Sequence, residues 1–451
     1  MPTPALMTTT LDHPTMPPSV IRRPAGLLAR MNVLNGALLL INAAVWVLNI
    51  ARGEWINTDY GAFYTGWSMA HQGNGGRLYD FALQKSTQLH LLGNRQYPGG
   101  LLAFVNPPHV ALLGSPVARL SMYHGYLVVA AVNTILAIVL AAGVFRVSGR
   151  GVAGRSTALA IAASASLAVA LTMGAFSVIV ALGMLGFIVG VKRADRFSPL
   201  LCFAFVGLSC KPQYVVLPLL ALAVSRRWRN IVSALCGLAS VFGVGAVAYG
   251  PHIWLDYAHR LQQYGNGKNS FGVNPQAMWN VRGVLTMIFG RGSASVVQSI
   301  STGVLAVTVV VVAVMWRRHG GHGAGAAPGG LIACTVLLAV TTSLHAHPQD
   351  GIVAAVALAA VATTRLPTRL PTRLPTRLPT RLPTRARFGH DADNPLTFAH
   401  LGLAFPVLTS IAVTLLRTPA GKLPFVFFVA IAVLAWRSTQ QPKQHMPTRS
   451  D

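Results

Sequence analysis

Residues 31–50 read MNVLNGALLLINAAVWVLNI, twenty residues without a single charged side chain. A helix needs about 20 mostly apolar residues to cross the hydrocarbon core of a bilayer. Similar runs of Leu, Ala, Val and Ile recur along the chain as far as residue 436. The sequence therefore predicts an all-α polytopic integral membrane protein.

The composition excludes other classes of protein. Hydrophobic residues make up 53% of the 451 residues and charged residues only 10%, whereas soluble domains are about a quarter charged. The apolar runs are continuous rather than alternating, which also argues against a membrane β-barrel. The net charge of +26 could indicate a nucleic-acid partner, but no nucleic acid is expected, because basic residues also accumulate on cytoplasmic loops of membrane proteins.

The Lys and Arg clusters assign a side to each loop. We predict a retained N-terminal anchor, both termini in the cytoplasm and about twelve spans. The number of spans could be as low as 10, because the two short segments 198–209 and 212–224 could instead form a re-entrant hairpin. The predicted spans are 31–50, 126–145, 158–172, 177–191, 198–209, 212–224, 231–249, 295–316, 331–343, 352–363, 396–416 and 424–436.

This topology divides the chain into segments. Residues 1–30 form a cytoplasmic tail, 31–363 a membrane module, 391–437 a C-terminal hairpin and 438–451 a second cytoplasmic tail. The outer loops of the module are predicted at about 51–121, 250–282 and 344–350. In the loop 364–390 the tetrapeptide Thr-Arg-Leu-Pro recurs, and Pro at every fourth residue excludes a helix there. This loop could bind anionic headgroups, but an expanded repeat that forms a disordered loop is the favoured interpretation.

Acidic residues are scarce, so each one is informative. Only ten occur, and five are predicted on the outer face: Glu54, Asp59, Asp80, Asp256 and Asp350. Asp59 follows the first span in the aromatic stretch NTDYGAFY, residues 57–64. One ionised carboxylate there could act as a general base on an alcohol, although Asp59 could instead cap the helix from Tyr60 onward. For Arg52, Glu54, Arg77 and Lys85 we favour snorkelling or structural ion pairs.

A series of short motifs carries a resemblance to a known family. They are Asp59-Tyr60 with Tyr64, Leu78-Tyr79-Asp80, Asn106-Pro107-Pro108, Gly174, Lys211-Pro212, Asn269-Ser270, Asn280-Val281-Arg282-Gly283 and Ser343-Leu344-His345 with Asp350. In this order the chain resembles glycosyltransferase family 87 over residues 55–350. The resemblance implies a GT-C-type fold with large first and fourth outer loops. It also implies a polyprenyl-phosphate sugar, typically mannose, as donor. Ala175 stands where the family often has Gln, and Gln349 where a His is common.

The resemblance assigns roles to particular residues. Asp59 would be the catalytic base, and His345 would engage the donor phosphate or orient the acceptor. The departing phosphate needs positive charge, for which the candidates are Lys211, Arg260, Lys268 and Arg282, and the further substrate-binding candidates are Asp350, Tyr64 and Asn269. No metal or other cofactor is expected, since the outer face has no Asp-x-Asp pair and the chain has no Gly-rich dinucleotide motif.

The sequence thus predicts a metal-independent hexosyltransferase of the bacterial inner membrane, with its active face toward the periplasm or cell exterior. Its partners would be the bilayer, a polyprenyl-phosphate sugar donor, and a lipid or glycan acceptor. A single displacement with Asp59 as base would invert the sugar linkage. Two alternatives stay open at this stage, a transporter or lipid flippase and an inactive membrane scaffold. Against a transporter, the two halves of the chain show no related motifs.

Overall fold

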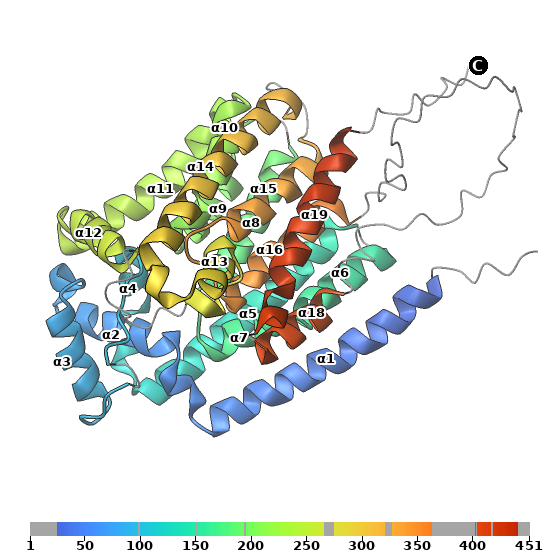
Figure 1. Ribbon diagram of the computed structural model, residues 1–451. Coiled ribbons are helices and arrows are strands. Elements are labelled where there is room, and N and C mark those ends of the chain that lie inside the picture. The colour runs from blue at the N-terminus through green and yellow to red at the C-terminus, as the bar shows by residue number, and fades with distance from the viewer. Residues whose placement is uncertain are drawn as a thin grey trace, which may run out of the picture.

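The computed structural model describes residues 25–97, 100–149, 151–193, 195–265, 275–320, 327–362, 402, 404–415 and 418–440. The site candidates Lys268 and Asn269 and the Thr-Arg-Leu-Pro loop lie outside these ranges. Within them the chain is helical, and its only β pairing is an isolated bridge between Tyr97 and Gly100. The expectation of an all-α protein is therefore confirmed for the described part of the chain (Figure 1).

Five segments are long and apolar enough to cross a membrane. They are α1 (Ala25–Ala51), α5 (Met122–Val147), α11 (Trp228–Tyr249), α14 (Ala294–His319), and the stretch formed by η8 (Pro419–Lys422) and α19 (Leu423–Gln440). The helices α6 (Val152–Ala162) and α7 (Ala165–Thr172) bend by 43° and add a sixth candidate if they form one span. Apolar side chains face outward on these helices, such as Val247 at 89% exposure. Such a surface suits lipid rather than water.

Shorter apolar helices complete the bundle. They are α8 (Ser177–Val191), α9 (Pro199–Ser209), η4 (Pro212–Tyr214) with α10 (Val216–Val224), α15 (Gly329–Thr341), α16 (Gly351–Val361) and α18 (Phe405–Thr414). Each coincides with a predicted span, but none reaches the length of a full crossing. The structure thus confirms several membrane-capable helices, whereas the total of about twelve spans stays a prediction.

Small residues let the interior helices approach closely, as is common in membranes. The helices α8 and α9 pack against each other, and α8 also packs against α16. A Cβ atom added to Gly183 of α8 would lie 2.6 Å from the carbonyl oxygen of Ala204, and one added to Gly207 of α9 would lie 3.0 Å from the oxygen of Ile179. Every residue of α16 is buried, so this helix forms the centre of the bundle.

The basic loops come together at one end of the bundle. The buried guanidinium of Arg227 donates to the carbonyl oxygens of Val191 and Arg193, both at 3.1 Å, and to that of Gly320 at 3.5 Å. The ends of α8 and α14 and the start of α11 therefore share this level. With 15 residues, α8 is about 10 Å shorter than the 22-residue α11. The far end of α8 is at Ser177.

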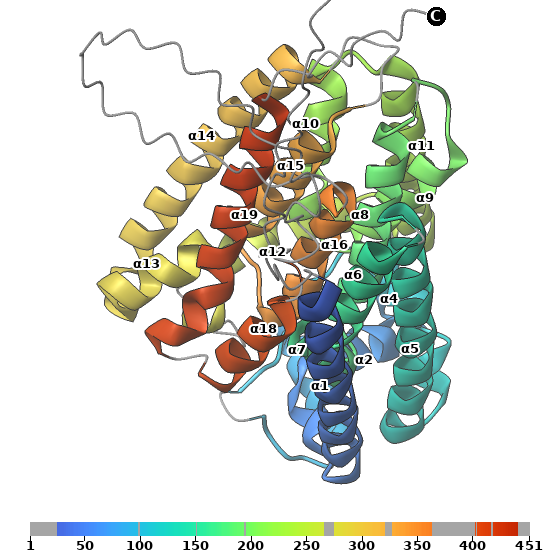
Figure 2. The ribbon, with the colours of Figure 1, turned by 90° about the vertical axis from the view of Figure 1, so that its right-hand side faces the viewer.

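Helices of the predicted outer loops cluster at the opposite end, where Figure 1 shows α2, α3, α4 and α12 together and Figure 2 shows α1 and α5 reaching the same end. The bounds of the four clustered helices are α2 (Asp59–His71), α3 (Phe81–Leu91), α4 (Pro108–Gly114) and α12 (Ile253–Gly265). A further short helix, α13 (Val281–Phe289), follows α12 along the chain. Short 3-10 turns lie between or beside the helices of the chain at η1 (Glu54–Asn57), η2 (Gly75–Arg77), η3 (Val117–Arg119), η5 (Pro275–Ala277), η6 (Arg291–Ser293) and η7 (Pro348–Asp350). The motif Asn106-Pro107-Pro108 leads into α4, which begins at Pro108.

Candidate active site

The core of the site lies at the N-terminal end of the central helix α16. Its N-terminus is preceded by η7, in which Gln349 and Asp350 are both buried. The backbone N–H of His347 donates to Asp350 Oδ2 at 3.2 Å, closing a capping box that fixes the turn. Because α16 is buried on all sides, the position of these two side chains is set by the packing of the whole bundle.

Asp59 comes to the same place from the first outer loop. It is the first residue of α2, and Gln349 Nε2 donates to its Oδ2 at 2.9 Å. The N-cap of α2 is Thr58, whose hydroxyl oxygen lies 3.4 Å from the backbone nitrogen of Tyr60. The alternative interpretation of Asp59 as the helix cap is therefore wrong, since a neighbouring residue caps α2 and leaves the Asp59 carboxylate directed at Gln349.

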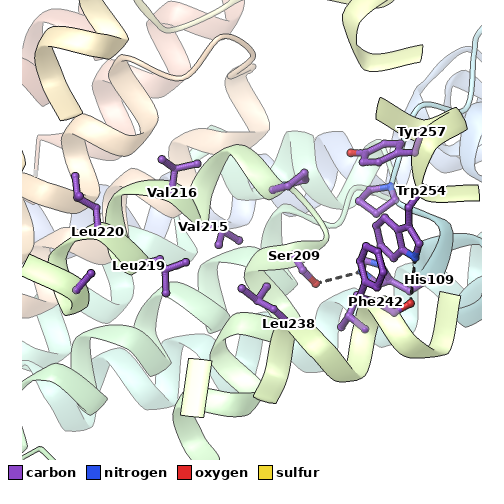
Figure 3. A pocket seen from close by; sticks show the side chains of 14 residues that line it. His109, Ser209, Val215, Val216, Leu219, Leu220, Leu238, Phe242, Trp254 and Tyr257 are labelled. Carbon is purple, nitrogen blue, oxygen red and sulfur yellow. Dashed lines mark hydrogen bonds between the residues drawn. The ribbon is translucent and has the colours of Figure 1, made fainter. Parts of the chain in front are cut away.

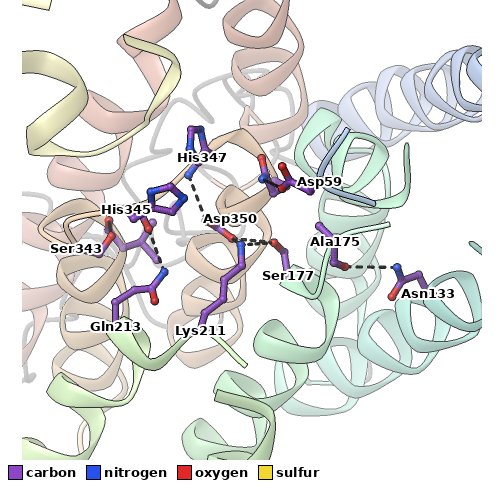
Figure 4. Close-up of polar contacts among 12 residues, drawn as sticks. Asp59, Asn133, Ala175, Ser177, Lys211, Gln213, Ser343, His345, His347 and Asp350 are labelled. Atoms are coloured by element: carbon purple, nitrogen blue, oxygen red, sulfur yellow. Dashed lines mark hydrogen bonds and ion pairs between the residues drawn. The ribbon is translucent and has the colours of Figure 1, made fainter. Parts of the chain in front are cut away.

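A buried ion pair stands beside Asp59. Lys211 Nζ donates to Asp350 Oδ1 and, at 3.0 Å, to Ser177 Oγ. The Ser177 hydroxyl in turn donates to Asp350 Oδ1 at 2.7 Å. Figure 4 shows these three side chains converging from the end of α9, the start of α8 and η7. Lys211 and Asp350 were predicted to lie on one face, whereas Ser177 was missed, because a lone Ser in an apolar run carries no distinguishing pattern.

The loop that carries His345 is held by the Asn280-Val281-Arg282-Gly283 motif. Asn280 caps α13 by accepting from the backbone N–H of Gly283 at 2.8 Å, while its amide donates to the carbonyl oxygen of Ser343 at 2.8 Å. Arg282 Nη1 donates to the oxygen of Leu344 at 3.3 Å. A Cβ on Gly283 would lie 2.1 Å from the oxygen of Met278, so only glycine fits there. Gln213, which lies in η4, donates from Nε2 to the carbonyl oxygen of His345 at 3.1 Å.

These elements surround one polar cavity of about 460 Å³. Its lining residues come from distant parts of the sequence. Asp59 and Gln349, for example, are hydrogen-bonded to each other but lie 290 positions apart. The chemically active side chains that line it are Asp59, Lys211, Gln213, Arg282, His345, His347 and Gln349. The rings of His345 and His347 meet edge to face, with their centroids 4.6 Å apart. Four predicted site residues, Asp59, Lys211, Arg282 and His345, thus share one cavity, with Asp350 directly behind Lys211.

Burial tunes the ionisable groups around this cavity. Burial raises the pKa of Asp59 above its ordinary value, and the neighbouring Asp350 carboxylate adds to this, while Lys211 and the bond from Gln349 oppose it. A raised pKa makes a carboxylate a better proton acceptor. Burial lowers the pKa of His347 to about 4 and that of His345 well below its usual range. Both imidazoles are therefore neutral at pH 7 and act as hydrogen-bonding groups rather than cations.

Two other predicted site residues, Tyr64 and Arg260, do not line the cavity. The Tyr64 hydroxyl donates to the carbonyl oxygen of Leu120, and its ring packs on Tyr60. Arg260 lies on α12, where Nη1 donates to Gln263 Oε1 at 2.6 Å and the guanidinium stands 4.6 Å from the centroid of the Phe81 ring. Lys268 and Asn269 belong to the residues left undescribed.

Two motif residues have clear structural roles. Gly174 ends α7 with φ +58°, a left-handed conformation that glycine adopts without strain. Asp80 caps α3 by accepting from the backbone N–H groups of Ala82 and Leu83, and it pairs with Arg77 at 2.6 Å. The expectation of a structural ion pair at Arg77 is confirmed.

An apolar groove adjoins the polar cavity. It measures about 490 Å³ and lies between α10 and α11, with Val216, Leu219, Leu238 and Phe242 among its lining (Figure 3). The two spaces share Pro107, Pro212, Val216 and Tyr257 as lining residues. The groove therefore opens onto the same region as the Asp59 cavity.

The described part of the chain contains no group of three or more His, Cys, Asp or Glu side chains placed to hold a metal ion. A reaction that needs no metal stays a prediction. The charges that reach the cavity are those of Asp59, Lys211 and Arg282, with Asp350 behind. Such a site can accept a proton at Asp59 and place an anion beside Lys211 and Arg282.

Comparison with known proteins gives one match. The family model described as Glycosyltransferase family 87 matches residues 104–344, more than half of the chain. Lys211 and Arg282 lie within the matched segment, and Asp59, Gln349 and Asp350 lie outside it. Neither the curated proteins nor the solved structures contain a match to this chain.

Proposed function

The chain belongs to glycosyltransferase family 87, a family of membrane glycosyltransferases, and on this premise we propose a specific reaction. A hexose, mannose by the family resemblance, moves from polyprenyl phosphate to a hydroxyl of a lipid- or glycan-linked acceptor. The observation that carries this proposal is the convergence of Asp59, Lys211 and Arg282 on one cavity.

The proposed step is a single displacement. The acceptor oxygen attacks C1 of the sugar, the bond from C1 to the phosphate oxygen breaks, and the acceptor proton passes to the Asp59 carboxylate. Attack from the face opposite the leaving group inverts C1, so a β-linked donor gives an α-linked product. A positioned general base of this kind contributes about 10²–10⁴-fold to the rate.

Polyprenyl phosphate is the leaving group, and it departs with the electrons of the broken bond. Positive charge fixed near the departing oxygen stabilises the transition state. Arg282 and Lys211 supply it, and Arg282 is suited to bidentate contact with phosphate oxygens. His345 and His347, held neutral by burial, offer hydrogen bonds to the phosphate or to the acceptor. No metal is required in this scheme.

The apolar groove between α10 and α11 supports a donor with a lipid chain. A polyprenyl chain is long and has no polar groups, and the lining of the groove is almost entirely apolar. Since the groove and the cavity share four lining residues, a lipid seated in the groove would bring its phosphate toward Lys211. We assign the groove to the donor chain for this reason.

The gathering of basic loops around Arg227 supports the proposed orientation. Short loops rich in Lys and Arg stay on the cytoplasmic side, and the cavity lies at the other end of α8. The active face would therefore be periplasmic or extracellular, and both termini cytoplasmic, in a bacterial inner membrane.

The test uses the purified full-length protein in liposomes with a panel of labelled polyprenyl-phosphate hexoses and, in parallel, the corresponding nucleotide sugars. The proposal predicts a new glycosidic bond from a polyprenyl-phosphate sugar only. Transfer from a nucleotide sugar would contradict the donor assignment. Movement of a labelled lipid across the bilayer without any new bond would instead favour the transporter alternative.

A further inference from the structure

Gln349 holds the proposed base in place. Its side chain is 3% exposed, and it lies in η7 above the buried helix α16. Its amide nitrogen donates to Asp59 Oδ2 at 2.9 Å. An ionised carboxylate only accepts hydrogen bonds, so the nitrogen of the amide, and not its oxygen, must face Asp59. The orientation of the amide is therefore fixed by its partner.

The other end of the same amide is unsatisfied. Among the side chains that the structure describes, Gln349 Oε1 is one of the buried oxygen atoms without a hydrogen-bond partner. Gln349 also lines the polar cavity. A buried carbonyl oxygen without a hydrogen-bond partner is unfavourable, and this penalty disappears when a ligand supplies a donor. A hydroxyl or amide N–H on a molecule that fills the cavity beside Gln349 would supply the missing donor.

We propose that Gln349 is a positioning and specificity residue of the acceptor site. Its amide nitrogen orients the Asp59 carboxylate, and its amide oxygen accepts a hydrogen bond from a second hydroxyl of the acceptor, next to the hydroxyl that reacts at Asp59. The acceptor is then a polyol or a sugar with neighbouring hydroxyls rather than a simple alcohol. The first role stands on the geometry alone, and the second rests on the proposed function.

The first role is tested by the titration of Asp59. The charged groups that act on Asp59 are Lys211 and Asp350, and the same cavity is lined by Arg282, His345 and His347. Gln349→Met keeps the length of the side chain and removes the donor to the ionised carboxylate, so the pKa of Asp59 should rise by about one unit. Gln349→Glu should raise it further, because two adjacent carboxyl groups share one proton.

Gln213→Met is the matched control. Gln213 lines the same cavity, but its amide donates to the backbone oxygen of His345 and not to Asp59. The readout is labelling of Asp59 by dicyclohexylcarbodiimide, which reacts with protonated carboxyl groups, followed across pH by mass spectrometry of the full-length protein in detergent. We expect the pH of half-maximal labelling to increase in the order parent, Gln349→Met, Gln349→Glu, and to stay at the parent value in Gln213→Met. An unshifted midpoint in Gln349→Met would overturn the positioning role.

The second role is tested by transfer. With labelled polyprenyl-phosphate mannose as donor and octyl mannoside and its mono-deoxy analogues as acceptors, the parent should lose about tenfold in kcat/KM for one analogue. Gln349→Met has no amide oxygen that could lose its hydrogen bond. This variant should therefore not discriminate between octyl mannoside and that deoxy analogue. Unchanged discrimination, or discrimination lost only against deoxy forms of the donor sugar, would overturn the acceptor assignment. Absence of any transfer by the parent would refute the proposed function, and the labelling result would still decide the positioning role.

Discussion

Replacing Lys211 by Met should destabilise the protein strongly. The Asp350 side chain is fully buried, and its donors are Lys211 Nζ, the Ser177 hydroxyl at 2.7 Å and the His347 N–H at 3.2 Å. The Met side chain resembles the apolar stem of Lys but carries no charge. The Asp350 carboxylate therefore keeps only neutral donors. Removing one partner of a buried ion pair costs about 3–5 kcal/mol, because the remaining charge is uncompensated.

The reciprocal change should recover most of this loss. Asp350→Asn in the Lys211→Met background removes the buried negative charge and keeps an oxygen that accepts from Ser177. The double-mutant cycle should therefore show a coupling of about 2–3 kcal/mol between the two positions, at the upper end of the range for contacting residues. Asp350→Asn alone should cost less than Lys211→Met, since the Lys211 side chain is 12% exposed and reaches the cavity.

The assay is unfolding of the purified protein by sodium dodecyl sulfate in mixed micelles, followed by tryptophan fluorescence. Lys85→Met is the control, because Lys85 is exposed on α3 and should cost no more than about 0.5 kcal/mol. A free energy of unfolding for Lys211→Met within about 1 kcal/mol of the parent, or a double variant as unstable as Lys211→Met, would show that the charge of Asp350 does not depend on Lys211.

Three further predictions concern pH, metals and packing. Burial raises the pKa of Asp59 above its ordinary value of 3.8, and the protonated carboxyl group cannot accept the proton of the acceptor. The transfer rate should therefore fall as the pH is lowered through this raised pKa. A pH–rate profile that is flat down to about pH 4 would contradict this. Chelation by EDTA should leave the transfer rate unchanged, and loss of activity restored by one added divalent cation would show a metal requirement. Gly183→Ala should destabilise the fold by about 1–3 kcal/mol, measured by the same unfolding assay, because its Cβ would meet Ala204. Gly243→Ala, with open space around its added Cβ, should not, and equal costs for the two would show that α8 does not depend on close packing.

The apolar runs predicted helices well, because each run of Leu, Ala, Val and Ile in the described residues is helical. Their lengths leave the number of membrane crossings a prediction. The interior helices end short of a full span, as α16 does after 11 residues. A run of apolar letters does not distinguish a helix surrounded by lipid from one surrounded by other helices, which is the situation of α16.

The site shows a similar division. Asp59, Lys211, His345 and Asp350 could be found because ionisable residues are rare and informative in an apolar chain. The bonds that join them could not be predicted, because they depend on which helix ends meet: Ser177 and Asp350 are 173 positions apart. Tyr64 was a candidate because of the family resemblance and Arg260 because of its charge, but the fold directs their side chains to Leu120 and to Phe81. Side-chain direction is set by the packing of α2 and α12, which sequence spacing leaves open.

The most direct test of the central claim is the transfer rate of Asp59→Asn with a polyprenyl-phosphate sugar, in protein matched to the parent for expression and unfolding. Asn has the same shape and can still accept the bond from Gln349, but it cannot take a proton at neutral pH. The transfer rate of Asp59→Asn should be lower than that of the parent by about 10²–10⁴-fold, with the donor still bound. Transfer by Asp59→Asn at the parent rate would contradict the assignment of this cavity as the reaction centre.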